Sequence, residues 1–147
     1  MAAERRAHTT WQGNLATGSG TFTLGSGAVG PQEVSWPART EESGGKTSPE
    51  ELIAAALSSC FSMALSGALA GAGTPPTTLE TDAVATFDKT DAGFRMTKIE
   101  LTVRGTVEGI DDAAFKQAAE EAKDGCPVSQ ALKGNVELTL DAALASS

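Results

Sequence analysis

The feature that most constrains this chain is an uncharged run from Leu52 to Ala70. It follows Ser48-Pro49-Glu50-Glu51, in which a serine suited to the N-cap position precedes a proline and, three residues on, a glutamate. This spacing is that of a capping box at the start of a helix. The sequence therefore predicts one long helix over Thr47–Ala70, with small side chains that would let another helix approach closely.

The same run is long enough to raise the question of a membrane span. It is rich in alanine and serine, however, and two glutamates precede it where a span would carry basic anchors. The N-terminus lacks the apolar run of a secretory signal. We therefore expect a buried helix in a soluble, cytoplasmic protein that has no membrane partner.

Length, charge and the numbers of cysteine and histidine limit which kinds of protein and site are possible. A chain of 147 residues is large enough to bury a core, and we expect a single domain over residues 1–147. The formal net charge of -8 argues against nucleic-acid binding, which rewards basic surfaces. Two cysteines and the single His8 are too few for a zinc site, so we expect no metal and no cofactor.

Strand patterns lie on both sides of the long helix. Before it we expect two short strands between Thr9 and Leu24 and a polar loop over Ala38–Lys46. After it the sequence predicts, in order, a hairpin of Leu79–Lys89 with Phe94–Val107, a helix capped by Asp111, a short helix after Cys126, and a final strand over Asn135–Ala142. This order indicates an α+β fold with mainly antiparallel sheets around the long central helix.

The two thiols have different expected environments. Cys126 directly precedes Pro127, so it would occupy the N-cap of the short helix, where free backbone N–H groups favour an anion. Cys60 lies in the middle of the long helix, where those groups are already used, and burial alone would raise its pKa. Cys60 is then either an inert core thiol or a nucleophile served by a cation from outside its helix. Arg39 is the candidate cation, and Glu50 is the carboxylate that would hold it.

The position of Glu50 adds a geometric condition. Ten positions separate it from Cys60, which corresponds to about 15 Å along a straight helix. The two side chains therefore cannot share a site within one subunit if the helix is unbroken. Two copies of the helix packed antiparallel would bring Glu50 of one chain toward Cys60 of the other, which predicts a homodimer with composite sites.

Three segments carry a family resemblance: TSPEELIAAALSSCFSMALS, DAGFRMTKIELTV and AKDGCPVSQALKGNVELTL. Together they resemble the OsmC/Ohr family of bacterial peroxidases, the osmotically inducible and organic hydroperoxide resistance proteins, over nearly the whole chain. The resemblance implies an intertwined homodimer of α+β subunits that reduces organic hydroperoxides, and hydrogen peroxide more weakly, in a stress response. The arginine in PARTEE and the lack of tyrosine favour the OsmC branch.

The resemblance also implies a role for each candidate residue. Cys60 matches the peroxidatic cysteine, Cys126 the resolving cysteine, and Glu50 the acidic partner of an arginine, here Arg39. Cys60 would become a sulfenic acid, and Cys126 would condense with it to a disulfide that an external dithiol reduces. In this family the reductant is often a lipoylated protein. Apolar residues expected to line a pocket for alkyl chains are Leu57, Phe61 and Phe115.

Other interpretations of the same residues stay open at this point. Taken alone, Cys60 is typical of a buried structural thiol, Glu50 of a first-turn helix acid, and Arg39 of a solvated loop charge. A redox sensor without peroxide turnover would carry the same pair of thiols. A non-catalytic, stress-related binding module on the same fold is the third hypothesis.

Overall fold

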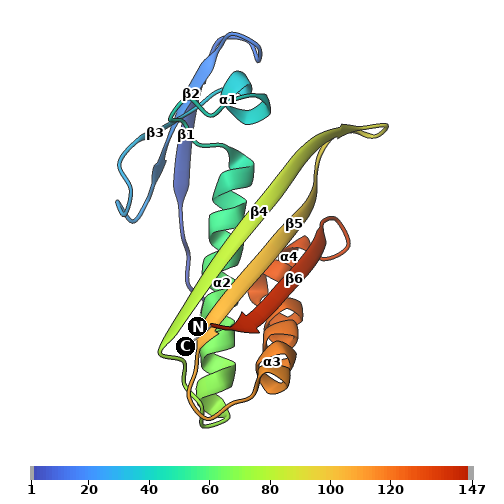
Figure 1. Cartoon of the computed structure of the whole chain (residues 1–147). Helices are drawn as coiled ribbons and strands as arrows, with labels where there is room; N and C mark the ends of the chain where they lie inside the picture. The colour runs from blue at the N-terminus through green and yellow to red at the C-terminus, as the bar shows by residue number, and fades with distance from the viewer. Residues whose placement is uncertain (1, 146–147) are drawn as a thin grey trace. The chain divides into compact units, whose positions relative to one another are not determined.

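The computed structural model describes residues 2–145 and shows a mixed α and β chain (Figure 1). Its elements in order are β1 (Ala7–Gln12), β2 (Ser19–Leu24), β3 (Gln32–Val34), α1 (Trp36–Thr40), α2 (Pro49–Gly71), β4 (Thr78–Thr90), β5 (Gly93–Thr106), α3 (Asp112–Gly125), α4 (Pro127–Leu132) and β6 (Glu137–Leu144). The α+β class expected from the sequence is confirmed. The chain forms two compact units, and the boundary between Leu52 and Ile53 falls inside α2. The single domain over 1–147 stays a prediction.

The sequence predicted the sheet of the first unit only in part. β1 and β2 pair antiparallel as expected, and β3 adds a third antiparallel strand. The short helix α1 stands where the polar loop was expected to begin. Ser35 caps α1 by accepting a hydrogen bond from the N–H of Ala38 at 3.2 Å, and Pro37 lies in its first turn. Because no N–H partner is needed there, the proline suits the start of this helix instead of preventing it.

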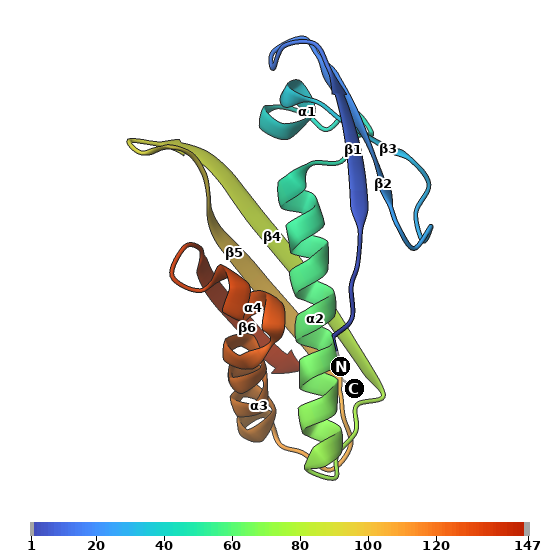
Figure 2. The same cartoon turned by 180° about the vertical axis from the view of Figure 1, so that it is seen from behind.

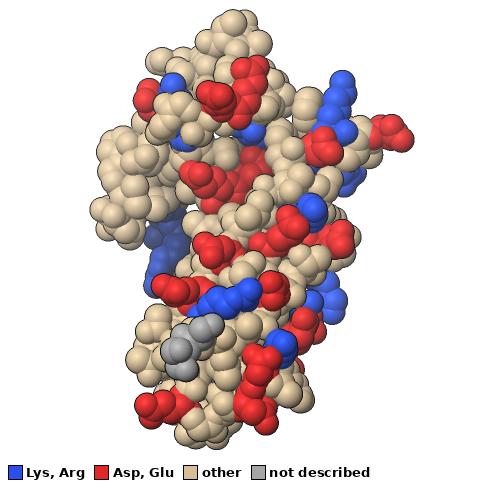
Figure 3. Space-filling model, viewed as in Figure 1, with Lys and Arg blue, Asp and Glu red and all other residues tan. Residues whose placement is uncertain are grey.

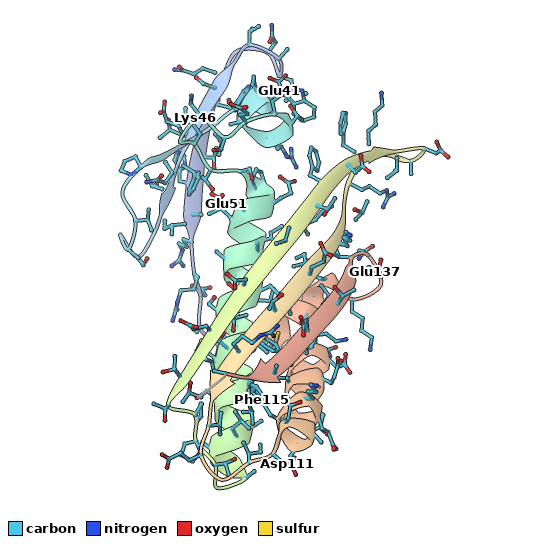
Figure 4. All side chains as sticks on the ribbon, viewed as in Figure 1. Glu41, Lys46, Glu51, Asp111, Phe115 and Glu137 are labelled. Carbon is cyan, nitrogen blue, oxygen red and sulfur yellow. The ribbon has the colours of Figure 1, made fainter. Side chains whose placement is uncertain are left out.

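The ends of α2 follow the predicted signals. The hydroxyl oxygen of Ser48 accepts a hydrogen bond from the N–H of Glu51 at 3.2 Å, as in a capping box. The carboxylate of Glu51, labelled in Figure 4, accepts a hydrogen bond from the Thr47 hydroxyl at 2.7 Å, so a hydroxyl supplies the second half of the box. At the other end Gly73 adopts a φ of 88°, the left-handed conformation that glycine tolerates after a helix.

The second unit is built on the sheet β4-β5-β6. β4 and β5 form the expected antiparallel hairpin, whereas β6 pairs with β5 in parallel. Figures 1 and 2 show α3, α4 and the part of α2 that belongs to this unit on one face of the sheet. This arrangement lets three helices and one sheet face share a core.

The core of this unit is formed mainly by stripes from α2, β5 and α3. Its fully buried members come from every fourth position of α2, from alternate positions of β5, from α3 and from the N-cap of α4, namely Leu57, Phe61, Leu65, Leu69, Ile99, Leu101, Val103, Phe115, Ala119 and Cys126. Phe115 (labelled in Figure 4) packs directly on Gly105, where a Cβ atom would come within 2.6 Å of the ring. The position of the Phe115 ring therefore requires a glycine at this point of β5.

The opposite side of α2 carries exposed apolar side chains. Met63 is 76% exposed and Leu52 39% exposed, although the helix was expected to be buried. By length and by its mean hydropathy of 1.8, the helix would be able to cross a membrane, a property that core helices of soluble proteins share. Core helices are mostly buried, whereas only 22% of the most apolar window of α2 is buried. The expected burial therefore holds for one stripe of the helix and not for its whole circumference.

The other face of the sheet β4-β5-β6 carries charged side chains. Lys98 lies 3.6 Å from Glu100, and Arg104 donates a hydrogen bond to the Asp141 carboxylate at 3.1 Å. Figure 3, viewed from this side, shows acidic and basic groups intermixed over the sheet. Exposed pairs of this kind contribute little to stability, but they keep this face in contact with water.

Candidate active site

The first part of the site is a partly buried ion pair in which two nitrogen atoms of the Arg39 guanidinium contact the Glu50 carboxylate, the Arg39–Glu50 fork. Arg39 lies in the last turn of α1, and Glu50 lies in the first turn of α2. The Nε atom of Arg39 lies 3.1 Å from both carboxylate oxygens of Glu50, and its Nη2 atom lies 2.7 Å from Oε1. Glu50 is 8% exposed. The structure therefore brings together the predicted cation and carboxylate, and most of the pair is removed from water.

A pocket of about 400 Å³ lies beside this fork within the first unit. Its lining residues are mostly apolar and comprise Trp11, Leu15, Val34, Ser35, Trp36, Arg39 and Pro49. The Arg39 guanidinium carbon lies 5.9 Å from the centre of the Trp36 ring, within the range of a cation–π contact. Neither tryptophan was predicted to lie at a site. The available signal was the spacing of Trp36 and Arg39, which places them one helical turn apart in α1.

The predicted alkyl pocket of Leu57, Phe61 and Phe115 is wrong. Each of these side chains is 0% exposed and belongs to the closed core of the second unit. Their size and apolar character suited either role, and only the packing decides between them. The apolar pocket next to a predicted site residue is the one that Arg39 lines.

The second part of the site is the pair of thiols. Both are free, with Cys60 partly buried in α2 and Cys126 1% exposed at the N-cap of α4. Cys126 lies close enough to Cys60 for its side chain to raise the pKa of the Cys60 thiol. Two thiols 66 positions apart in the sequence are therefore neighbours within one unit of the fold.

The surroundings of Cys60 act on its pKa in opposite directions. Burial raises the pKa of the Cys60 thiol, and the hydrogen bond to Cys126 and the negative charge that Cys126 can carry raise it further. The N–H of Val128 donates to the Cys60 sulfur and lowers it. The net effect is a pKa above the ordinary value, so a single chain does not by itself hold Cys60 as a thiolate.

The donor from Val128 corrects one expectation. The first turn of α4 was expected to serve Cys126, its N-cap residue, and Cys60 was expected to lack such help. The side chain of Cys126 instead makes no capping hydrogen bond, and the N–H of Val128, in that same turn, lowers the pKa of Cys60. The contact could not be read from sequence because it joins two helices that are distant in the chain.

Sequence analysis did not single out one further residue, Ser129. Its side chain is 3% exposed, and its Oγ atom lies 3.0 Å from Sγ of Cys126. The available signal was its position three residues after Cys126 in the same short helix, since residues three apart face the same side of a helix.

The fork and the thiols lie in different compact units of the chain. The fork belongs to the first unit, and both cysteines belong to the second. α2 is continuous from Glu50 to Cys60, so its helical rise separates them by about 15 Å, as predicted. Among residues 2–145 no group of three His, Cys, Asp or Glu side chains is placed to hold a metal ion.

Comparison with known proteins gives the same family throughout. Residues 42–141 match the family described as OsmC-like protein. The chain is 44% identical to peroxiredoxin OsmC of Escherichia coli over 146 residues, which cover 99% of this chain and 100% of that protein. It is 33% identical to organic hydroperoxide resistance protein OhrA of Bacillus subtilis over 101 residues, which cover 66% and 67% of the two chains.

Solved structures share the fold. A crystal structure of an organic hydroperoxide resistance protein from Elizabethkingia anophelis aligns with a TM-score of 0.76 at 24% identity, over 99% of this chain and 100% of the other. An organic hydroperoxide resistance protein OsmC from Legionella pneumophila aligns with a TM-score of 0.73 at 20% identity, over 97% and 99%. The match of residues 42–141 and the identity over nearly the whole length show that this chain belongs to the OsmC-like family, as its sequence led us to expect.

Proposed function

We propose that this protein is a thiol-dependent peroxidase that reduces organic hydroperoxides, and hydrogen peroxide more weakly. Its relatives include a peroxiredoxin and organic hydroperoxide resistance proteins, which support a peroxide-reducing thiol role in general. The observation that carries the proposal is the contact between the free thiols of Cys60 and Cys126. Two adjacent thiols can pass between a dithiol and a disulfide, which is the chemistry such a peroxidase needs.

The reaction has two chemical steps. The Cys60 thiolate attacks the distal oxygen of the hydroperoxide, the O–O bond breaks, and the alkoxide takes up a proton and leaves as the alcohol. Cys60 is then a sulfenic acid, which condenses with the Cys126 thiol to a disulfide and water. An external dithiol, such as that of a lipoylated protein, reduces the disulfide and restores both thiols.

Arg39 is proposed to make the first step possible. Since burial and Cys126 raise the pKa of Cys60, its thiolate needs a cation nearby. The Glu50 carboxylate already fixes the guanidinium of Arg39 through three short contacts. A guanidinium held in this way can stabilise the thiolate and polarise the peroxide without reorganising during the reaction.

The cation is proposed to come from a second copy of the chain. α2 is unbroken, so Glu50 and Cys60 of one chain lie too far apart along the helix to share a site. Its uncovered side presents small residues and Met63, which is 76% exposed, as a surface that an antiparallel α2 would bury. The proposed unit is a homodimer with two composite sites.

The pocket beside Arg39 supports a preference for organic substrates. It is lined largely by apolar groups, including Trp11 and Trp36, and an alkyl or aryl substituent would be desolvated there. Hydrogen peroxide has no such group, so it would gain nothing from the pocket. A cytoplasmic location is part of the proposal, because the cytosol supplies the thiol reductants that would return such a disulfide to two thiols.

The experiment that tests the proposed function is stopped-flow consumption of tert-butyl hydroperoxide with dithiothreitol as the reductant. We expect turnover in the parent, no oxidation in Cys60→Ser, and one sulfenic acid per site without disulfide formation in Cys126→Ser. Equal activity in the parent and both variants would exclude the mechanism. Oxidation of the parent without turnover would indicate a redox sensor instead.

Composite sites have a separate test. A Cys60→Ser chain keeps Arg39, and an Arg39→Met chain keeps Cys60, so each variant alone lacks one part of every site. If the sites are composite, mixing the two chains assembles heterodimers with one complete site, and activity returns. No recovery in mixtures that demonstrably exchange subunits would contradict composite sites while leaving the thiol chemistry untouched.

A further inference from the structure

Only two polar side chains are buried among the described residues 2–145, Glu50 and Ser129. A buried polar group is costly unless it is hydrogen-bonded, so the partner of each deserves an explanation. Glu50 is accounted for by Arg39. Ser129 is hydrogen-bonded to the sulfur of Cys126 at 3.0 Å.

The geometry points to Ser129 as a positioning residue that holds and activates Cys126 for its condensation with oxidised Cys60, an inference that rests on the proposed function. Cys126 is the N-cap of α4 but makes no capping hydrogen bond, so its sulfur is not held by the helix backbone. Ser129, one helical turn later, points its hydroxyl back to that sulfur from a site that is 3% exposed. Within residues 2–145 the hydroxyl has no other hydrogen-bond partner, so its orientation serves the thiol alone.

The chemistry of the second step explains what the hydroxyl contributes. The sulfur of Cys126 attacks the sulfur of the Cys60 sulfenic acid, an S–S bond forms, and the S–O bond breaks. Cys60 is thereby reduced and Cys126 oxidised, and the proton of the Cys126 thiol leaves with the hydroxide as water. While that proton departs, the O–H of Ser129 can donate to the sulfur and stabilise its negative charge. The same hydrogen bond fixes the side-chain torsion that keeps Cys126 in contact with Cys60.

The test separates the two chemical steps in Ser129→Ala. We expect the rate of Cys60 oxidation by tert-butyl hydroperoxide to stay within about threefold of the parent, while disulfide formation slows about tenfold, the effect of about one hydrogen bond to a charged group. Quenched samples analysed by intact mass follow the two steps separately. Ser129→Thr restores a hydroxyl and should return the rate toward that of the parent. Ser62→Ala, which removes a hydroxyl that bonds within α2 and to Thr81, is the matched control and should change neither step.

A pair of variants of matched volume distinguishes positioning from a loss of packing. Ser129→Thr and Ser129→Val have nearly the same side-chain volume, but only threonine keeps a hydroxyl for the sulfur of Cys126, so we expect disulfide formation to be about tenfold faster in the threonine variant, at pH 6 as at pH 8. A purely structural role would give the two variants equal rates, and that result overturns the inference even if Ser129→Ala is less stable. Unchanged disulfide formation in Ser129→Ala also overturns it. If the parent itself is not oxidised at Cys60, the proposed function fails instead, and the first phase of the same experiment reports it.

Discussion

The backbone N–H of Val128 lowers the pKa of the Cys60 thiol, so the first turn of α4 acts on a thiol of another helix, while Cys126 at the N-cap of α4 makes no capping hydrogen bond. Two influences meet at this sulfur. The backbone donor favours the thiolate, whereas burial and Cys126 favour the protonated thiol. Reactivity at Cys60 is therefore set by groups outside α2, and it can be shifted in either direction by changing them.

Removing the Cys126 side chain should lower the pKa of Cys60. In Cys126→Ala the hydrogen bond and the negative charge that raise this pKa are both lost, while the donor from Val128 stays. Because the thiolate is the form that reacts, alkylation of Cys60 should reach half its maximum rate at lower pH than in the parent. Site-resolved iodoacetamide kinetics over a pH series measure this. A midpoint that is unchanged or higher would show that Cys126 does not act on Cys60.

The guanidinium fork should be essential to the first chemical step. Arg39→Lys keeps the positive charge but cannot reproduce the contacts of Nε and Nη2 with Glu50. We expect the second-order rate of Cys60 oxidation to fall about 100-fold, the usual cost of losing a fixed electrostatic donor. Arg104→Lys is the matched control, because Arg104 pairs with Asp141 on the charged face of the sheet, and its rate should equal that of the parent. A fully active Arg39→Lys would remove Arg39 from the mechanism.

The uncovered side of α2 should form the dimer contact. Met63→Lys places a charge at a position that is 76% exposed in the single chain, and we expect it to produce monomers that no longer reduce hydroperoxide. The added cation would itself favour a thiolate at Cys60, so a lost rate cannot be attributed to its charge. Val84→Lys, at a position on β4 that is 58% exposed, is the control and should stay dimeric. Sedimentation velocity measures the oligomeric state of both variants, and parallel assays measure their hydroperoxide reduction. A fully active monomer would contradict composite sites.

The contact between Phe115 and Gly105 should be intolerant of a side chain. A Cβ atom at Gly105 would come within 2.6 Å of the fully buried ring, so Phe115 or β5 would have to move. We expect Gly105→Ala to destabilise the fold by about 1–3 kcal/mol, as overpacked cores do. A Cβ atom at Gly30 would meet no atom of a non-neighbouring described residue within 4 Å, and Gly30→Ala should change the unfolding free energy by less than about 0.5 kcal/mol. Chemical denaturation compares the two variants, and equal stabilities would contradict the packing described for this core.

The sequence was informative where a local signal decides the structure. The Ser48 cap fixed the start of α2, and the turn before Gly93 fixed the hairpin of β4 and β5. The parallel pairing of β6 could not be predicted, because alternation of apolar and polar residues along a strand carries no direction. α1 was missed because the polar residues from Ala38 onward were taken as a loop, although Ser35 suits an N-cap and Pro37 the first turn of a helix.

For the site, the sequence predicted the reactive residues but not most of their contacts. Charge and thiol chemistry singled out Arg39, Glu50 and the two cysteines, and the structure joins them as two separate pairs. The influence of Val128 on Cys60 and the contact of Ser129 with Cys126 could not be inferred in advance, because a backbone donor leaves no mark in the sequence and serine is common on helices. Whether an apolar residue lines a pocket or fills a core depends on its neighbours, which is why Phe61 and Phe115 were misassigned.

The redox partnership of Cys60 and Cys126 can be read from the intact mass of the protein after one equivalent of tert-butyl hydroperoxide per chain. The parent should lose about 2 Da as the two thiols become a disulfide, and Cys126→Ser should gain about 16 Da as its Cys60 stops at the sulfenic acid. A parent that gains about 16 Da and never loses 2 Da, or a Cys126→Ser variant whose mass does not change, would show that the two thiols in contact are not one redox centre.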